Sequence, residues 1–220
     1  MIKKSVYSLV LADDLVRAVD RLAYMQHTSR SNLINQILAE HLSLSTPEMR
    51  MREILSRMEQ IFDTSNSFQI ALRPTDSQMA LRSSISYKYN PTVQYSVVLY
   101  RNAGSSFGEL RVAFRTRNAS LINMLTDFFK LWVKIENSYF TRLFPSKQLS
   151  YDIQPGKFVR ELMIPDNAAL DSDNSLGDAV ARYVRLFDSM LKLYFENPTA
   201  SPAHIQSEYL AYLRSGAAII

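Results

Sequence analysis

The amino-acid sequence predicts an α+β protein: a small N-terminal module of one strand and two helices, then a larger α+β domain with an antiparallel sheet covered by amphipathic helices. Three observations support this class. Residues 3–11 are mostly apolar, include β-branched and aromatic types, and show the two-residue period of a strand. Helical patterns fill the stretch from residue 13 to 62, and strand patterns begin near residue 67. We therefore expect a module at residues 1–44, a connecting helix at 45–66, and an α+β domain at 67–220.

The N-terminal helices carry clear start signals. Asp13 and Asp14 favour a helix N-terminus, where negative charge is stabilised. Ser29 is a good N-cap for a second helix. Thr46 followed by Pro47 predicts the start of the connecting helix. The apolar stripe of that helix could face either the core or a second chain: Met51, Ile54, Leu55, Met58, Ile61 and Phe62.

The remaining 154 residues contain strand patterns that alternate in the manner of a half-buried sheet, and within 108–117 the alternation predicts an inward face of Leu110, Val112 and Phe114. Strands are expected within residues 67–72, 78–89, 92–101 and 108–117, and a further strand or hairpin at about 149–164. Helices at 118–140, 175–197 and 202–214 supply apolar stripes to cover one face. The polar face carries basic residues that could receive an anion or could simply be solvated: Arg82, Lys88, Arg111, Arg115 and Arg117.

Composition restricts the classes of function. The chain has no cysteine, which excludes disulfides, thiolate metal sites and cysteine nucleophiles. Its three histidines have no carboxylate or second histidine at metal-ligand spacing, and no glycine-rich phosphate-binding motif occurs. We therefore expect no enzymatic activity, no metal and no cofactor.

Charge and hydropathy point to a soluble, cytoplasmic protein with no membrane partner. No apolar run reaches the roughly 20 residues of a spanning helix. The run from Val6 to Leu11 is too short for a signal peptide. The net charge of +4 comes mainly from residues 46–118, which carry ten basic and six acidic side chains. Such a charge permits nucleic-acid binding without requiring it.

The N-terminal module is too small to bury a core by itself, and its strand has no partner within the module. Two chains would solve both problems by pairing their strands antiparallel and interlocking their helices. On the stretches SVYSLVLADDL and LAYMQHTSRSNLINQIL, residues 3–42 resemble the ribbon-helix-helix family of MetJ/Arc/CopG-type DNA-binding proteins. The resemblance implies a homodimer that binds double-stranded DNA and regulates transcription, as a repressor. The paired strands would enter the major groove.

The resemblance also implies roles for individual residues. Because Leu11 precedes the first helix and should point inward, alternation favours one assignment of the strand's two faces over the flipped register, which would expose Ser5, Tyr7, Leu9 and Leu11. Base contacts fall to Lys4, Val6, Ser8 and Val10, and phosphate contacts to Lys3, Ser29, Arg30 and Ser31. The shared dimer core would contain Tyr7, Leu9, Leu11, Leu33, Ile34 and Ile37.

Two positions depart from the family pattern. The family commonly places polar side chains on the outer strand face, whereas here Val6 and Val10 flank the single hydroxyl of Ser8. A valine can contact only a thymine methyl group. His27 stands where the family usually has glycine in the turn between the helices, and histidine tolerates the left-handed conformation better than most residues.

Other functions fit the same sequence. The protein could be a DNA-organising accessory protein of the plasmid partition or relaxation type, with weak sequence preference. It could also be a protein-interaction module that has lost DNA binding. The second domain could add higher-order contacts between dimers or sense a small-molecule effector, although no residue pattern identifies such a ligand.

Overall fold

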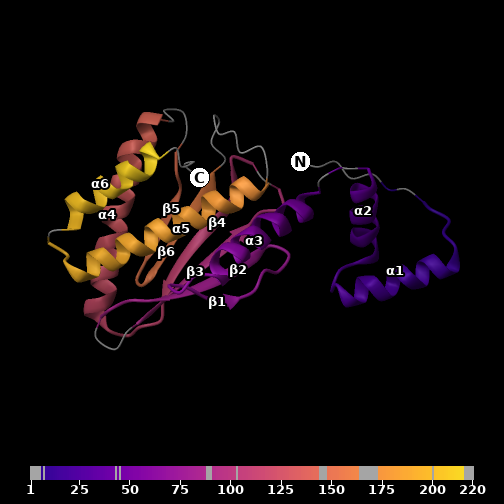
Figure 1. Ribbon diagram of the computed structural model, residues 1–220, viewed down its shortest axis with the longest axis horizontal. Helices are drawn as coiled ribbons and strands as arrows, with labels where there is room; N and C mark the ends of the chain where they lie inside the picture. The colour runs from indigo at the N-terminus through magenta and orange to yellow at the C-terminus, as the bar shows by residue number, and fades with distance from the viewer. Residues whose placement is uncertain are drawn as a thin grey trace. The chain divides into compact units, whose positions relative to one another are not determined.

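The computed structural model describes residues 6, 8–42, 44, 46–87, 91–102, 104–143, 148–163, 173–199 and 201–215 (Figure 1). The chain divides into two compact units, Met1–Arg50 and Met51–Ile220. Helices and an antiparallel sheet are both present, so the predicted α+β class is confirmed.

The first unit consists of two helices, α1 at Asp13–Met25 and α2 at Arg30–His41. Both begin within a residue of the predicted start signals. Their shared core is small: Val19, Ala23 and Leu33 are buried, and Ile34 packs against them half-buried.

The predicted strand at residues 3–11 is wrong for the single chain. Val6 and the residues from Ser8 to Ala12 form no strand, and the first strand among the described residues begins at Gln69. A strand is stable only when its backbone N–H and C=O groups pair with a neighbour. Among the described residues of this unit there is no second strand to pair with. The predicted site residues Lys3, Lys4 and Tyr7 lie outside the described residues.

Helix α3 spans Pro47–Asp63 and starts where the sequence predicts. The Thr46 hydroxyl accepts a hydrogen bond from the Met49 N–H at 3.2 Å and caps the first turn. Of the two interpretations of its apolar stripe, the structure shows core packing. The buried side chains belong to the main hydrophobic core: Met51, Ile54, Leu55, Met58 and Phe62.

The second unit is built on a six-stranded sheet. Its strands are β1 Gln69–Leu72, β2 Gln78–Ser84, β3 Thr92–Leu99, β4 Ser106–Phe114, β5 Tyr151–Gln154 and β6 Lys157–Met163. The order across the sheet is β1-β2-β3-β4-β6-β5, and every neighbouring pair is antiparallel. The hairpin at the end of the sheet therefore adds to β4 through its second strand.

Helices α4 (Ala119–Leu143), α5 (Asp173–Glu196) and α6 (Ser201–Arg214) complete the unit (Figure 1). The predicted inward face of β4, with Leu110, Val112 and Phe114, is buried. It shares one core with Trp132 of α4 and Phe187 of α5, whose rings lie 5.1 Å apart. The alternation of this unit thus produces one apolar face covered by helices and one polar face.

Candidate nucleic-acid interface

The turn between α1 and α2 sets the direction in which α2 starts. His27 has a positive φ of 50°, in the left-handed region where glycine is usual. The Thr28 N–H donates to the Ala23 carbonyl at 3.0 Å and closes the end of α1. The sequence expectation that histidine could occupy this turn is confirmed.

The start of α2 is capped by a serine, and its first turn has no acidic side chain of its own. Ser29 has extended backbone geometry, and its hydroxyl accepts from the Asn32 N–H at 3.2 Å, as predicted for an N-cap. The first turn contains no acidic residue, in contrast to α1, which begins on Asp13 and Asp14. The first N–H groups of a helix have no carbonyl partner within it, so this end suits an anion.

Two further polar side chains lie in the same turn. Arg30 and Ser31 are both exposed and follow directly on the cap. The Arg30 guanidinium forms an ion pair with the carboxylate of Asp20 on α1. The sequence offers no spacing signal for this pair, because its members lie ten positions apart on two different helices. Of the four predicted phosphate contacts, the structure brings Ser29, Arg30 and Ser31 together.

The predicted base-contacting residues that the structure describes are fully accessible. Val6 is 98% exposed and Val10 is 103% exposed, and Ser8 between them is also exposed. On the other predicted face of this segment, Leu9 is 61% exposed and Leu11 is half-buried. The segment therefore presents its valines to solvent more completely than its leucines.

The predicted dimer core is only partly buried within one chain. Leu33 is buried and Ile34 is half-buried, but Ile37 is 43% exposed. Leu38 of α2 and Leu42, the residue that follows the helix, are exposed as well. In the single chain α1 is too short to cover all the apolar side chains of α2, and the shared core of a dimer stays a prediction.

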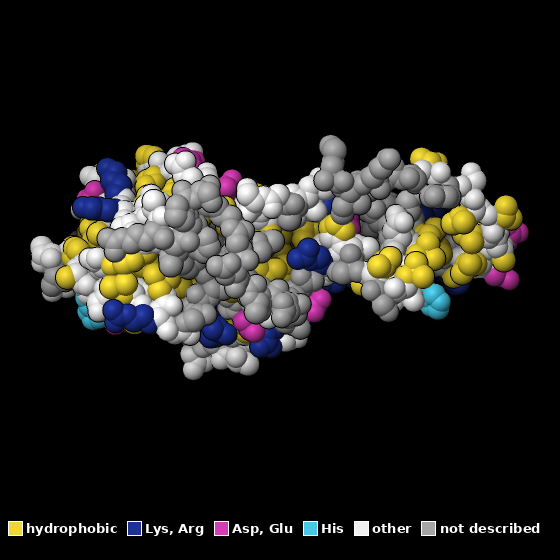
Figure 2. All heavy atoms as spheres, turned by 90° about the horizontal axis from the view of Figure 1, so that it is seen from above, with side chains coloured by type: hydrophobic (Ala, Val, Ile, Leu, Met, Phe, Trp, Pro, Cys, Tyr) yellow, Lys and Arg dark blue, Asp and Glu magenta, His cyan; other side chains and the backbone are white. Residues whose placement is uncertain are grey.

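Exposed apolar side chains concentrate on this unit. Among the described residues, every exposed large hydrophobic side chain except Leu72 lies between residues 6 and 44. They are Val6, Leu9, Val10, Leu15, Leu22, Tyr24, Met25, Ile37, Leu38, Leu42 and Leu44. We call this set the apolar surface of the first unit, and Figure 2 shows hydrophobic side chains gathered over this part of the chain.

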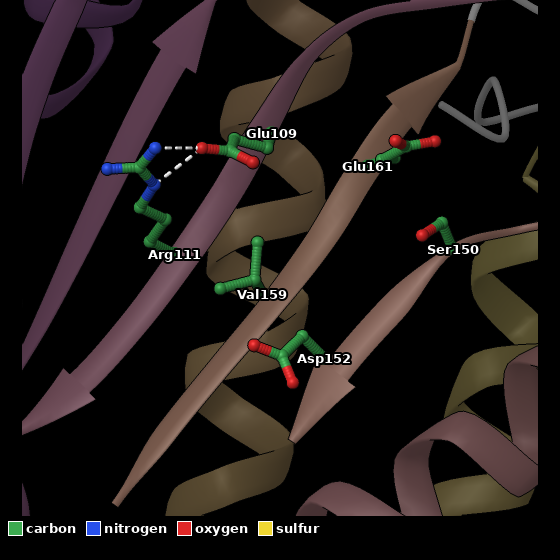
Figure 3. Close-up of a pocket in the computed structure, with 6 residues that line it drawn as sticks. All are labelled: Glu109, Arg111, Ser150, Asp152, Val159 and Glu161. Carbon is green, nitrogen blue, oxygen red and sulfur yellow. Dashed lines mark hydrogen bonds and ion pairs between the residues drawn. The ribbon is translucent and has the colours of Figure 1, made fainter. Parts of the chain in front are cut away.

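The polar sheet face of the second unit holds an open depression of about 380 Å³ (Figure 3). Three carboxylates reach it from three strands: Glu109 from β4, Asp152 from β5 and Glu161 from β6. Arg111 is ion-paired with Glu109 (Figure 3). The surplus of negative charge disfavours an anion at this depression.

Tyr100 lies beside the same carboxylate, and its hydroxyl donates to Glu109 at 2.9 Å. Burial and this hydrogen bond raise the pKa of Tyr100 to about 12. The hydroxyl therefore stays protonated at neutral pH and remains a donor to Glu109.

A buried ion pair in the second unit was not predicted from the sequence. Glu136 and Arg160 are fully buried, and the Arg160 Nε donates to both Glu136 carboxylate oxygens at 3.1 Å. The Tyr151 hydroxyl donates to the same carboxylate at 3.2 Å, and the Arg160 guanidinium lies 4.4 Å from the centre of the Tyr183 ring. Burial lowers the pKa of Arg160, but the Glu136 carboxylate together with Tyr183 and Tyr151 outweighs this effect and leaves that pKa raised. The pair is closed to solvent and holds α4 against β6.

Within the described ranges, no group of three His, Cys, Asp or Glu side chains is placed to hold a metal ion. No helix in those ranges combines the length and apolar character needed to cross a bilayer.

Comparisons with protein-family models, with curated proteins and with solved structures found no match for this chain.

Proposed function

We propose that this protein is a homodimeric, sequence-specific DNA-binding regulator that represses transcription in the cytoplasm. Its first 44 residues would form a ribbon-helix-helix module once two chains pair. The observation that carries the proposal is the apolar surface of the first unit. Two predicted dimer-core residues, Leu9 and Ile37, are exposed on it in the single chain.

The occupant of that surface is a second copy of the same unit. A core of three buried side chains and Ile34 is too small to stabilise two helices. Exposed apolar side chains concentrated in this way favour association with another chain. Antiparallel pairing of two copies of residues 3–11 would satisfy the backbone of both segments and bring Leu9 and Leu11 of each over the helices.

The start of α2 supports DNA as the ligand of that dimer. A serine-capped helix N-terminus with Arg30 and Ser31 in its first turn, and no acidic residue of its own there, favours a phosphate group. Such a phosphate would replace the Asp20 carboxylate as the partner of Arg30. A dimer presents two such ends, related by its two-fold axis, on either side of the paired strands. This is the arrangement in which a ribbon lies in the major groove and the helices hold the flanking backbone. Repression follows because a dimer bound over a promoter excludes other proteins from the same groove.

The test is a binding titration with selected DNA. A duplex enriched from a randomised pool is compared with a scrambled duplex by fluorescence anisotropy, from about 50 mM to about 200 mM salt. A repressor is expected to bind the selected duplex at least about 1,000-fold more tightly than the scrambled one. Equal affinity with a steep salt dependence would identify a DNA-organising protein instead. Absence of binding to both duplexes at low salt would contradict DNA binding altogether.

Single variants separate the two parts of the proposal. Arg30→Ala is expected to weaken all duplexes alike and to lower the salt slope by about one unit, because its guanidinium no longer neutralises a phosphate. Arg21→Ala, on the exposed side of α1, removes the same charge and serves as its control.

Ile37→Asp is expected to give monomers in analytical ultracentrifugation, whereas Asn35→Asp on the same helix should leave the dimer intact. A wild-type chain that sediments as a monomer at micromolar concentration would contradict the dimer.

A further inference from the structure

The outer side of the N-terminal segment combines full exposure with an unusual chemistry. Val6 and Val10 are the two most exposed large hydrophobic side chains among the described residues. The exposed Ser8 separates them, and two lysines, Lys3 and Lys4, precede them in the sequence. In an extended chain residues 6, 8 and 10 point the same way. The segment therefore offers methyl groups on either side of one hydroxyl, next to positive charge.

A partner for the outer side of the N-terminal segment must be negatively charged and must also expose methyl groups. Valine has no hydrogen-bond donor or acceptor, so it cannot read the polar edges of guanine, cytosine or adenine. In the major groove the matching group is the C5-methyl of thymine, which the other bases lack. The phosphates beside it would complement the lysines. Double-stranded DNA meets both requirements at once.

We propose that the paired N-terminal segments recognise thymine methyl groups through Val6 and Val10, so that the preferred DNA site carries A·T pairs under the ribbon. This inference rests on the proposed function, because the segment reaches bases only as part of a DNA-bound dimer. The two-fold axis places a valine pair from each chain in the groove, so thymines are expected at symmetry-related positions. Ser8 bonds either a donor or an acceptor edge and leaves the central position less selective.

Deoxyuridine provides the direct test. It keeps every hydrogen-bonding group of thymidine and lacks only the C5-methyl. In the selected duplex each thymine is replaced in turn, and affinity is measured by fluorescence anisotropy. We expect a loss of about fourfold for each thymine whose methyl packs on a valine, and no loss at thymines outside the ribbon.

Because loss of the methyl also changes base stacking, a protein variant must accompany the DNA change. Val10→Ala shortens the side chain, so the thymine-to-uracil ratio at the contacted position should fall towards one. Leu72→Ala, an exposed apolar residue of the second unit, should keep the full ratio. A ratio unchanged in Val10→Ala would assign the effect to DNA shape and overturn the inference.

The outcomes distinguish this inference from the proposed function. Equal, tight binding of the thymine and uracil duplexes would overturn methyl recognition and leave a DNA-binding dimer. Failure to bind either duplex would overturn the proposed function itself. A selected site without thymines under the ribbon would also overturn methyl recognition.

Discussion

At the scale of single residues, the main feature that the sequence analysis missed is a pair of charged side chains, Glu136 and Arg160, on otherwise apolar faces. Glu136 follows Trp132 by four residues, so it falls on the buried stripe of α4. Arg160 stands between Phe158 and Leu162 on the inward face of β6. The spacing of the apolar residues in this helix and this strand could by itself have identified Glu136 and Arg160 as buried charges. It could not have identified their pairing, because 24 residues separate them and only the fold brings the two elements together.

Removing one member of this pair should be strongly destabilising. Glu136→Ala leaves the Arg160 guanidinium buried without its counter-charge, and we expect the free energy of unfolding to fall by about 3–5 kcal/mol. Urea denaturation followed by circular dichroism measures the change. The double variant Glu136→Leu with Arg160→Met removes both charges and is expected to be less destabilised than the single variant. A single variant within about 1 kcal/mol of wild type would contradict this account.

The ion pair between Asp20 and Arg30 leads to a second prediction at this scale. If Arg30 holds a phosphate, Asp20 competes with that phosphate for the guanidinium. Asp20→Asn should therefore raise affinity for DNA by up to about fivefold. The control is Asp14→Asn, which removes the same charge from α1 beside Arg17. Equal gains in both variants would show that only the net charge matters.

At the scale of elements, helix starts were predicted well because their signals are local. Ser29 and Thr46 cap α2 and α3 as expected, since a cap needs only its own side chain and the next turn. Strand pairing is not local. The sequence suggested a strand or hairpin near residues 149–164, but nothing in its residues showed that β6 rather than β5 would join β4. The isolated strand at 3–11 was wrong for the single chain because its pairing partner must come from elsewhere.

Gly177 marks a close approach between two elements, and its replacement is testable. A Cβ at this position would lie 2.8 Å from the Ile54 carbonyl oxygen and 2.8 Å from the Arg57 Cβ, both on α3. Alanine favours a helix by about 1 kcal/mol over glycine. We nevertheless expect Gly177→Ala to lower the free energy of unfolding by about 1 kcal/mol or more, because α3 and α5 must move apart.

Thermal or urea denaturation checks this expectation. Gly104→Ala is a suitable control, since a Cβ there has no neighbour within 4 Å and should change stability by less than about 0.5 kcal/mol. A Gly177→Ala variant more stable than wild type would mean that helix propensity outweighs the contact between the two helices.

At the scale of the whole molecule, the two units bury their apolar residues very differently. The second unit closes a large core around Trp132, Phe187 and Tyr95. The first unit leaves most of its large apolar side chains accessible. Most of the buried apolar side chains that stabilise the single chain therefore lie in the second unit, and the proposed dimer would bury those that the first unit leaves exposed.

The buried tyrosines predict how stability depends on pH. Burial raises the pKa of Tyr95 and Tyr183, and burial and Glu109 raise that of Tyr100 to about 12. An unfolded tyrosine titrates near about 10. Above that pH the unfolded chain binds fewer protons than the folded one, so the free energy of unfolding should fall as pH rises. The contribution of these tyrosines to the free energy of unfolding is complete below about pH 10. It is lost as the pH rises through the pKa values that the tyrosines have in the folded chain.

Urea titrations between about pH 8 and about pH 11 measure this slope. Tyr100→Phe removes one of the responsible hydroxyls and should make the decline shallower above about pH 10. Asp152→Asn, a change on the same sheet face that spares the hydroxyl, should leave the slope as in wild type. A stability that stays level across this range would contradict the assignment.

The sequence by itself determined the α+β class, the capped starts of α2 and α3, the inward face of β4 and the stripe of α4. These features depend on periodicity and on side chains a turn apart, which short stretches of chain encode. Only the tertiary structure decided the strand order, the pairing of Glu136 with Arg160 and of Asp20 with Arg30, and the concentration of exposed apolar side chains between residues 6 and 44. Each of these depends on contacts between residues far apart in the chain or on a side chain's total burial, and no local pattern encodes either.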